Sequence, residues 1–106
     1  WSEQIRSSDI LARLGGEEFA VLLPQTTIAQ AELIAEKFRD VTASTPISID
    51  LGDGKNLTLE VTVSIGLAST DHIANNASLD ALMSEADGAL YQAKRKGRNR
   101  VVSHRN

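Results

Sequence analysis

The 106-residue sequence contains no cysteine, which excludes disulfide bonds and thiolate metal sites. Aromatic residues make up only 4% of it, and no apolar run approaches the ~20 residues that a membrane-spanning helix needs. The sequence also has no excess of basic residues: its formal net charge is −3. Nucleic acid is therefore not an expected partner. The composition is that of one small globular domain in a reducing compartment. We expect a cytoplasmic domain, whose longer parent protein could carry a membrane anchor elsewhere.

The segment Gly15-Gly16-Glu17-Glu18 stands between two runs of alternating apolar residues, 10–14 and 19–23. Because glycine adopts positive φ without steric cost, the pattern predicts two strands joined by a tight turn. The two glutamates would then lie at the hairpin tip. Backbone N–H groups beside a carboxylate can bind the phosphates of a nucleotide and a divalent cation. For a motif this short, a hairpin whose acids are only solvated is the more frequent outcome.

The rest of the chain alternates between helical and strand patterns. Helices are predicted at about 28–43 and 79–96, and a short last strand at 101–102. A strand at 47–51 and a long alternating run over 57–68 predict a second hairpin, with one face of the long strand buried. We expect each helix to bury its apolar stripe. The stripes are Ala31, Ile34, Ala35, Phe38 and Val41 in the first helix, and Leu79, Leu82, Met83, Ala86, Ala89, Leu90 and Ala93 in the second.

Gly66 lies inside the long strand pattern. A glycine there indicates either a bulge or the close approach of another backbone.

Basic residues gather near the end of the chain, with six of the eleven lysines and arginines between Lys94 and Arg105. Lys94 and Arg98 are four residues apart across the end of the second helix, so both could reach one anion, such as a triphosphate. The same pattern also fits solubility and charge complementarity with the negative end of the helix dipole. Only Tyr91 interleaves an aromatic ring, which argues against a platform for single-stranded nucleic acid.

Four segments, taken together in their order and spacing, resemble the GGDEF domain, the catalytic domain of diguanylate cyclases. The resemblance covers essentially the whole chain. The segments are Gly15-Gly16-Glu17-Glu18-Phe19 (the signature in its GGEEF form), Arg6-Ser7-Ser8-Asp9 (the RxxD inhibitory site), 63–68 (the central VSIGVA strand) and 86–99 (the AD-ALY-AK--GRN ending).

The resemblance implies an α+β fold of ferredoxin-like type, related to the nucleotide cyclases and the polymerase palm, with a mostly antiparallel sheet and packed helices. It implies that two GTP molecules are condensed into cyclic di-GMP and two pyrophosphates, with Mg²⁺ or Mn²⁺ as cofactor. Two domains would face each other as a homodimer, and cyclic di-GMP would inhibit them at the RxxD site. A non-catalytic cyclic di-GMP receptor or interaction module is the alternative.

The resemblance also assigns a role to each matching residue. The acids of the signature serve metal binding and catalysis, the glycines and two basic residues bind the substrate, and three residues bind the inhibitory product. Lysine stands about where some members of the family place an arginine for that product, so this contact is expected to be weaker. The assignments are Glu17 (metal and catalysis), Glu18 (catalysis), Gly15, Gly16, Lys94 and Arg98 (GTP), and Arg6, Asp9 and Lys37 (product).

In the family, a first strand and helix upstream of the signature carry a second metal ligand, an aspartate, and the residues that recognise guanine. Only fourteen residues precede Gly15 here, and the first aspartate is Asp9. Residues 1–8 have the pattern of the tail of a helix. We therefore expect residues 1–106 to be the C-terminal two-thirds of a single GGDEF domain, marginally stable and inactive without the remainder.

Overall fold

The computed structural model describes residues 10–15, 19–70 and 78–104. Both predicted helices are present, and their bounds agree with the sequence pattern to within one residue. Neither is long and apolar enough to cross a membrane. The elements are β1 (Ile10–Leu14), β2 (Phe19–Leu23), α1 (Ile28–Ser44), β3 (Ile47–Gly52), β4 (Lys55–Leu59), β5 (Ile65–Ser69), α2 (Leu79–Arg95) and β6 (Val101–Ser103).

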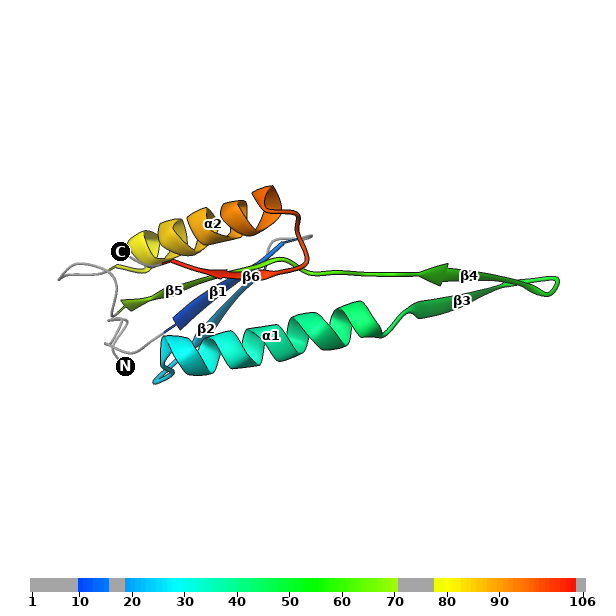
Figure 1. Cartoon of the computed structure of the whole chain (residues 1–106), viewed down its shortest axis with the longest axis horizontal. Coiled ribbons are helices and arrows are strands. Elements are labelled where there is room, and N and C mark those ends of the chain that lie inside the picture. Colours follow the sequence, from blue (N-terminus) through cyan, green and yellow to red (C-terminus); the bar gives the residue numbers. More distant parts are fainter. Residues whose placement is uncertain (1–9, 16–18, 71–77, 105–106) are drawn as a thin grey trace.

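The main sheet has the strand order β2-β1-β5-β6. β1 pairs antiparallel with both β2 and β5, and only β5 and β6 run parallel. α2 covers one face of this sheet and α1 lies on the other (Figure 1). The predicted α+β class with a mostly antiparallel sheet is confirmed.

Both faces of the sheet contribute to the core, because successive strand side chains point to opposite sides. On the α1 side, Ile10, Ile65 and Leu67 pack with Ala31 and Ala35 of the helix. On the α2 side, the second cluster consists of Leu11, Ala68, Leu82 and Ala86. The central strands β1 and β5 therefore hold the two layers together.

The backbone of α2 lies directly against Gly66, which has the tightest surroundings of the described glycines. A Cβ atom at this position would lie 2.2 Å from the backbone nitrogen of Leu90 and 2.4 Å from the carbonyl oxygen of Ala86. Of the two alternatives that the sequence left open at Gly66, the structure supports the close approach of another backbone. Glycine here lets the helix rest directly on the strand.

The expectation of one long strand over 57–68 is wrong. The run divides into β4 and β5, and residues 60–64 belong to neither. The β3–β4 hairpin projects beyond the main sheet (Figure 1), so the chain between β4 and β5 pairs with no other strand among the described residues. The expected single buried face is wrong for the same reason: β5 is buried throughout between the helices, whereas β4 is exposed throughout.

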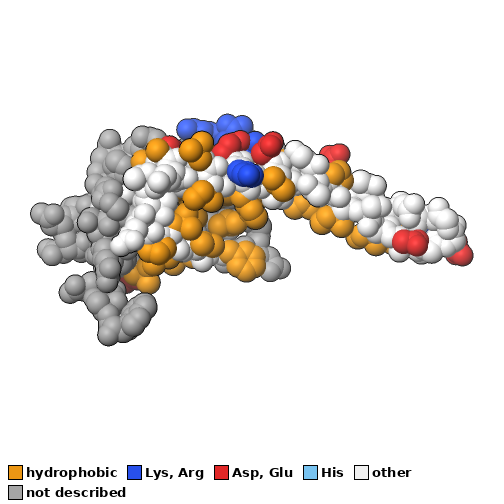
Figure 2. Space-filling model, turned by 90° about the horizontal axis from the view of Figure 1, so that it is seen from below, with side chains coloured by type: hydrophobic (Ala, Val, Ile, Leu, Met, Phe, Trp, Pro, Cys, Tyr) orange, Lys and Arg blue, Asp and Glu red, His pale blue; other side chains and the backbone are white. Residues whose placement is uncertain are grey.

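The expected burial of the α1 stripe is also only partly correct. Ala31 and Ala35 are buried, but Ile34, Phe38 and Val41 remain about half exposed. Figure 2 shows apolar side chains gathered on this side of the molecule. A groove of about 240 Å³, lined by apolar residues only, runs here between α1 and the sheet. Within the described chain, nothing covers this face. Helical periodicity therefore predicted which residues form the apolar stripe, but not how far they are buried.

Candidate functional site

Gly15 and Lys94, which the sequence placed in one site, come together in the structure. Lys94 lies in the last turn of α2, and a Cβ atom at Gly15 would be 2.8 Å from its Cε and 3.5 Å from its Nζ. The backbone N–H of Gly15 donates a 2.9 Å hydrogen bond to the carbonyl oxygen of Ser64, just before β5. The ammonium group of Lys94 is thus held beside the first glycine of the Gly-Gly turn.

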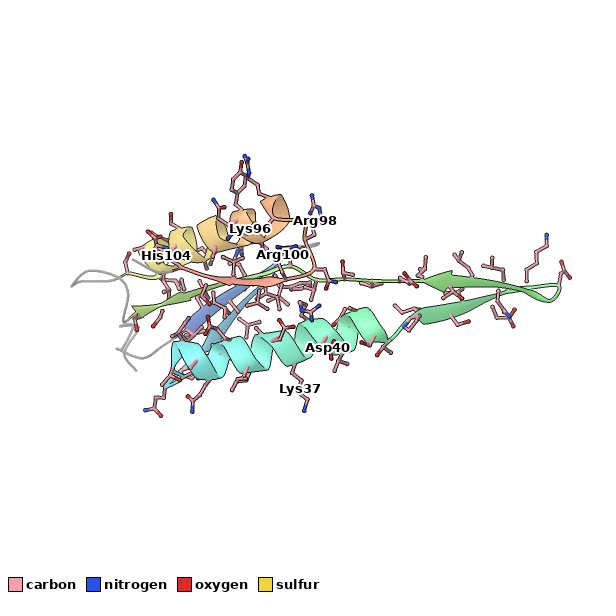
Figure 3. The ribbon with its side chains drawn as sticks, in the orientation of Figure 1. Lys37, Asp40, Lys96, Arg98, Arg100 and His104 are labelled. Carbon is pink, nitrogen blue, oxygen red and sulfur yellow. The ribbon has the colours of Figure 1, made fainter. Side chains whose placement is uncertain are left out.

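Arg98 follows α2 in a turn with unusual backbone conformation. Gly97, Arg98 and Asn99 have φ values of 121°, 64° and 49°. Figure 3 shows Arg98 just beyond the C-terminal end of α2, with its side chain directed away from α1. The turn keeps Arg98 at the same end of the helix as Lys94, which fits two cations serving one anion.

An ion pair that sequence reasoning missed joins β1 to α2 near this site. The Nε of Arg13 lies 2.6 Å from the Oδ1 of Asp87, and the Arg13 side chain is only 14% exposed. Arg13 is two residues before Gly15 and therefore shares its strand face. The sequence alone shows that Arg13 lies next to the turn. It does not show that Asp87 is its partner, because that contact depends on how α2 crosses the sheet.

A second polar cluster, also missed from the sequence, lies between α1 and the turn after α2. The guanidinium of Arg39 donates to Glu36 through Nε and Nη2, and its Nη1 donates a 2.8 Å hydrogen bond to the Oδ1 of Asn99. The hydrogen bond from Arg39 holds the pKa of Glu36 below its usual value. Asn99 belongs to the predicted GRN ending, but its partner on α1 had no signal in the sequence.

Among the other predicted site residues, Lys37 is the one that the structure describes, and it does not join this constellation. Lys37 is exposed on α1, on the opposite face of the sheet from α2, and points away from the sheet (Figure 3). The described residues contain no group of three or more histidine, aspartate or glutamate side chains that could hold a metal ion. Five predicted residues lie outside the described part of the chain: Arg6, Asp9, Gly16, Glu17 and Glu18.

Known proteins are similar to this chain in both sequence and fold. The diguanylate cyclase DgcP of Pseudomonas aeruginosa is 36% identical over 93% of this chain and 14% of its own length. The GGDEF domain of DgcB from Caulobacter crescentus has a TM-score of 0.80 at 23% identity, covering 94% of this chain and 77% of that one, which shows the fold. The active GGEEF domain of a Vibrio cholerae diguanylate cyclase has a TM-score of 0.69 at 29% identity, covering 87% and 53%.

The matches concern a part of each relative, since the chain spans about a quarter or less of the length of the curated relatives that it matches. The family model described as "Diguanylate cyclase, GGDEF domain" matches residues 2–100, nearly the whole chain. The order of the sequence segments, the α+β fold and this match agree, and the chain belongs to the GGDEF domain family of diguanylate cyclases.

Proposed function

We propose that the protein carrying this chain is a diguanylate cyclase, which condenses two GTP into one cyclic di-GMP and releases two pyrophosphates. The observation that carries the proposal is the position of Lys94 against Gly15, at the start of the Gly-Gly-Glu-Glu segment. This arrangement sets a cation beside a turn whose first residue has no side chain, which favours the binding of an anion such as a triphosphate. The similarity to the Vibrio cholerae GGEEF domain also supports it.

In the proposed reaction, the 3′-hydroxyl of each GTP attacks the α-phosphate of the other. A new P–O bond forms, the bond to pyrophosphate breaks, and the hydroxyl proton is lost, twice per product. Lys94 and Arg98 hold the triphosphate and offset its charge, while the lack of a side chain at Gly15 lets Lys94 lie close to the backbone there. Each domain supplies one nucleotide, so the active form is a homodimer.

We also propose that Mg²⁺ or Mn²⁺ binds at the signature, with Glu17 as a ligand and Glu18 as the second acid needed for activity. Mg²⁺ sites that handle phosphates commonly use one or two carboxylates, with phosphate oxygens and water as the other ligands. A site next to the Gly15–Lys94 pair, where the phosphates would lie, suits that ligand set. The ion, when bound, offsets phosphate charge and lowers the pKa of the attacking hydroxyl.

The chain is proposed to be the C-terminal two-thirds of its GGDEF domain and inactive without the remainder. Support comes from the apolar groove beside α1 and from the half-exposed Ile34 and Phe38, which a further part of the same domain would cover. The DgcB domain, which resembles this chain in fold, extends beyond the 77% that the chain matches. We assign the groove to the upstream strand and helix of the domain.

The direct test is to incubate the full-length parent protein with GTP and Mg²⁺ and to measure products by chromatography. We expect one cyclic di-GMP and two pyrophosphates for every two GTP, and no product from residues 1–106 alone. Binding of GTP without any cyclic di-GMP in the full-length protein would contradict the enzymatic proposal.

Cyclic di-GMP itself is proposed to bind at Arg6 and Asp9, with Lys37 as a weaker contact, and to inhibit the enzyme. Replacing Arg6 with alanine is expected to weaken cyclic di-GMP binding about 10- to 100-fold, since a hydrogen bond to a charged group contributes roughly 1.5–3 kcal/mol. Isothermal titration calorimetry of the full-length protein measures this. If Arg6→Ala abolishes binding and the unaltered protein shows no turnover, the receptor alternative is favoured. Unchanged binding in Arg6→Ala would refute the assignment of this site.

Replacing Gly15 with alanine is expected to lower GTP affinity about 3- to 10-fold while changing the free energy of unfolding by less than about 1 kcal/mol. The added methyl group meets the flexible end of the Lys94 side chain, which can move aside but then leaves the turn. Calorimetry with GTP measures the affinity of the full-length protein. In a Lys94→Ala background the same change should cause little further loss, and a full additional loss would contradict this explanation.

A further inference from the structure

The turn that carries Arg98 is held in a conformation that its sequence does not favour. Arg98 and Asn99 have φ values of 64° and 49°, in the left-handed region. Asparagine tolerates this region comparatively well, but a long side chain such as arginine is strained in it. Surrounding contacts must therefore keep the turn in place, and such strain is most common at functional sites.

Two side chains from distant parts of the chain, Ser64 and Arg39, hold Asn99. The backbone N–H of Asn99 donates a 3.1 Å hydrogen bond to the Oγ of Ser64. Its side-chain Oδ1 accepts the 2.8 Å hydrogen bond from Arg39 of α1, whose side chain is 17% exposed and paired with Glu36. Both contacts come from residues far away in the sequence, so they are part of the tertiary structure.

Ser64 connects Gly15, beside which Lys94 lies, to the turn that carries Arg98. Its carbonyl oxygen accepts from the N–H of Gly15, and its hydroxyl accepts from the N–H of Asn99. Ser64 is 5% exposed, and its hydrogen bond with Asn99 is partly buried. One buried residue thus links the backbone of Gly15 to the turn bearing Arg98.

We infer that Ser64, Arg39 and Asn99 are positioning residues that set the direction of the Arg98 side chain toward the triphosphate. None of the three needs to contact the nucleotide. Their effect passes through the left-handed backbone at Arg98, because releasing Asn99 lets the strained turn relax and Arg98 change direction. The inference rests on the proposed function, in which Arg98 binds the triphosphate.

The test uses the full-length protein and 3′-deoxy-GTP with Mg²⁺, since this nucleotide carries the triphosphate but lacks the attacking hydroxyl. Asn99→Gly removes the acceptor for Arg39 but keeps the N–H that binds Ser64 and accepts the positive φ. We expect Asn99→Gly and Arg39→Ala each to weaken binding about 3- to 10-fold, because a redirected Arg98 loses only part of its charge-assisted contact with the triphosphate. Asn56→Gly, in the exposed strand β4, is the matched control and should leave binding unchanged.

A double-mutant cycle separates positioning from a general structural role. Asn99→Gly should cause no further loss in an Arg98→Ala background but its full loss in a Lys94→Ala background. Equal losses in both backgrounds, or no loss from either Asn99→Gly or Arg39→Ala, would overturn the inference while leaving the proposed function intact. If Arg98→Ala binds the nucleotide as well as the unaltered protein does, the proposed role of Arg98 fails, and the inference fails with it. Circular dichroism of every variant checks that it is folded.

Discussion

Replacing Gly66 with alanine is expected to destabilise the domain by about 3 kcal/mol or more, at the upper end of what overpacking a core costs. The new Cβ would lie 2.2 Å from the nitrogen of Leu90 and 2.4 Å from the oxygen of Ala86. Both are backbone atoms of α2, so no side-chain rotation relieves the clash. The helix would have to move away from β5, and the core on that side of the sheet would loosen.

Gly88→Ala provides the matched control for this prediction. Gly88 lies in the same helix, but its added Cβ meets nothing within 4 Å. Alanine in an exposed helical position should raise the free energy of unfolding by up to about 1 kcal/mol. Urea denaturation of both variants in the full-length protein measures the difference. A Gly66→Ala variant as stable as Gly88→Ala would mean that α2 does not rest on β5 as closely as described.

Replacing Glu17 with alanine is expected to abolish the formation of cyclic di-GMP by the full-length protein. In the proposed site this carboxylate holds the divalent ion, whose charge stabilisation amounts to several kcal/mol. Since each 1.36 kcal/mol changes the rate tenfold, the loss should reach roughly a thousandfold or more. The rate of cyclic di-GMP release from GTP and Mg²⁺ is the measurement.

Glu60→Ala is the control for Glu17→Ala, because Glu60 is exposed and follows β4, in the segment that leads away from the projecting hairpin. It should retain the activity of the unaltered protein. Persistent activity in Glu17→Ala would reject the metal-ligand assignment, although the family membership of the chain would stand.

Local patterns predicted the secondary structure well where a segment carries its own signals. Thr27 and Gln30 have the spacing of a capping box and form both of its hydrogen bonds, and α1 begins at Ile28, directly after Thr27. Ser78 caps α2 through a single hydrogen bond, which its Oγ accepts from the N–H of Ala81. The antiparallel pairing of β1 and β2 also follows from local alternation around Gly15.

The extent of burial was less predictable, because it depends on which elements pack together. The α1 stripe and the strand run over 57–68 both have clear periodicity, yet Phe38 stays half exposed and β4 is exposed throughout. Periodicity indicates which side chains share a face, but the neighbours that cover this face come from distant parts of the chain.

The sequence alone was enough to identify the family of this protein, both helices and the antiparallel pair of strands β1 and β2, because these depend on short segments of fixed spacing. Only the tertiary structure showed that Lys94 lies against Gly15, that Gly66 admits the backbone of α2, and that Ser64 and Arg39 hold Asn99. The physical reason is that these contacts join elements distant in the chain, and their geometry follows from how α1 and α2 pack on the sheet.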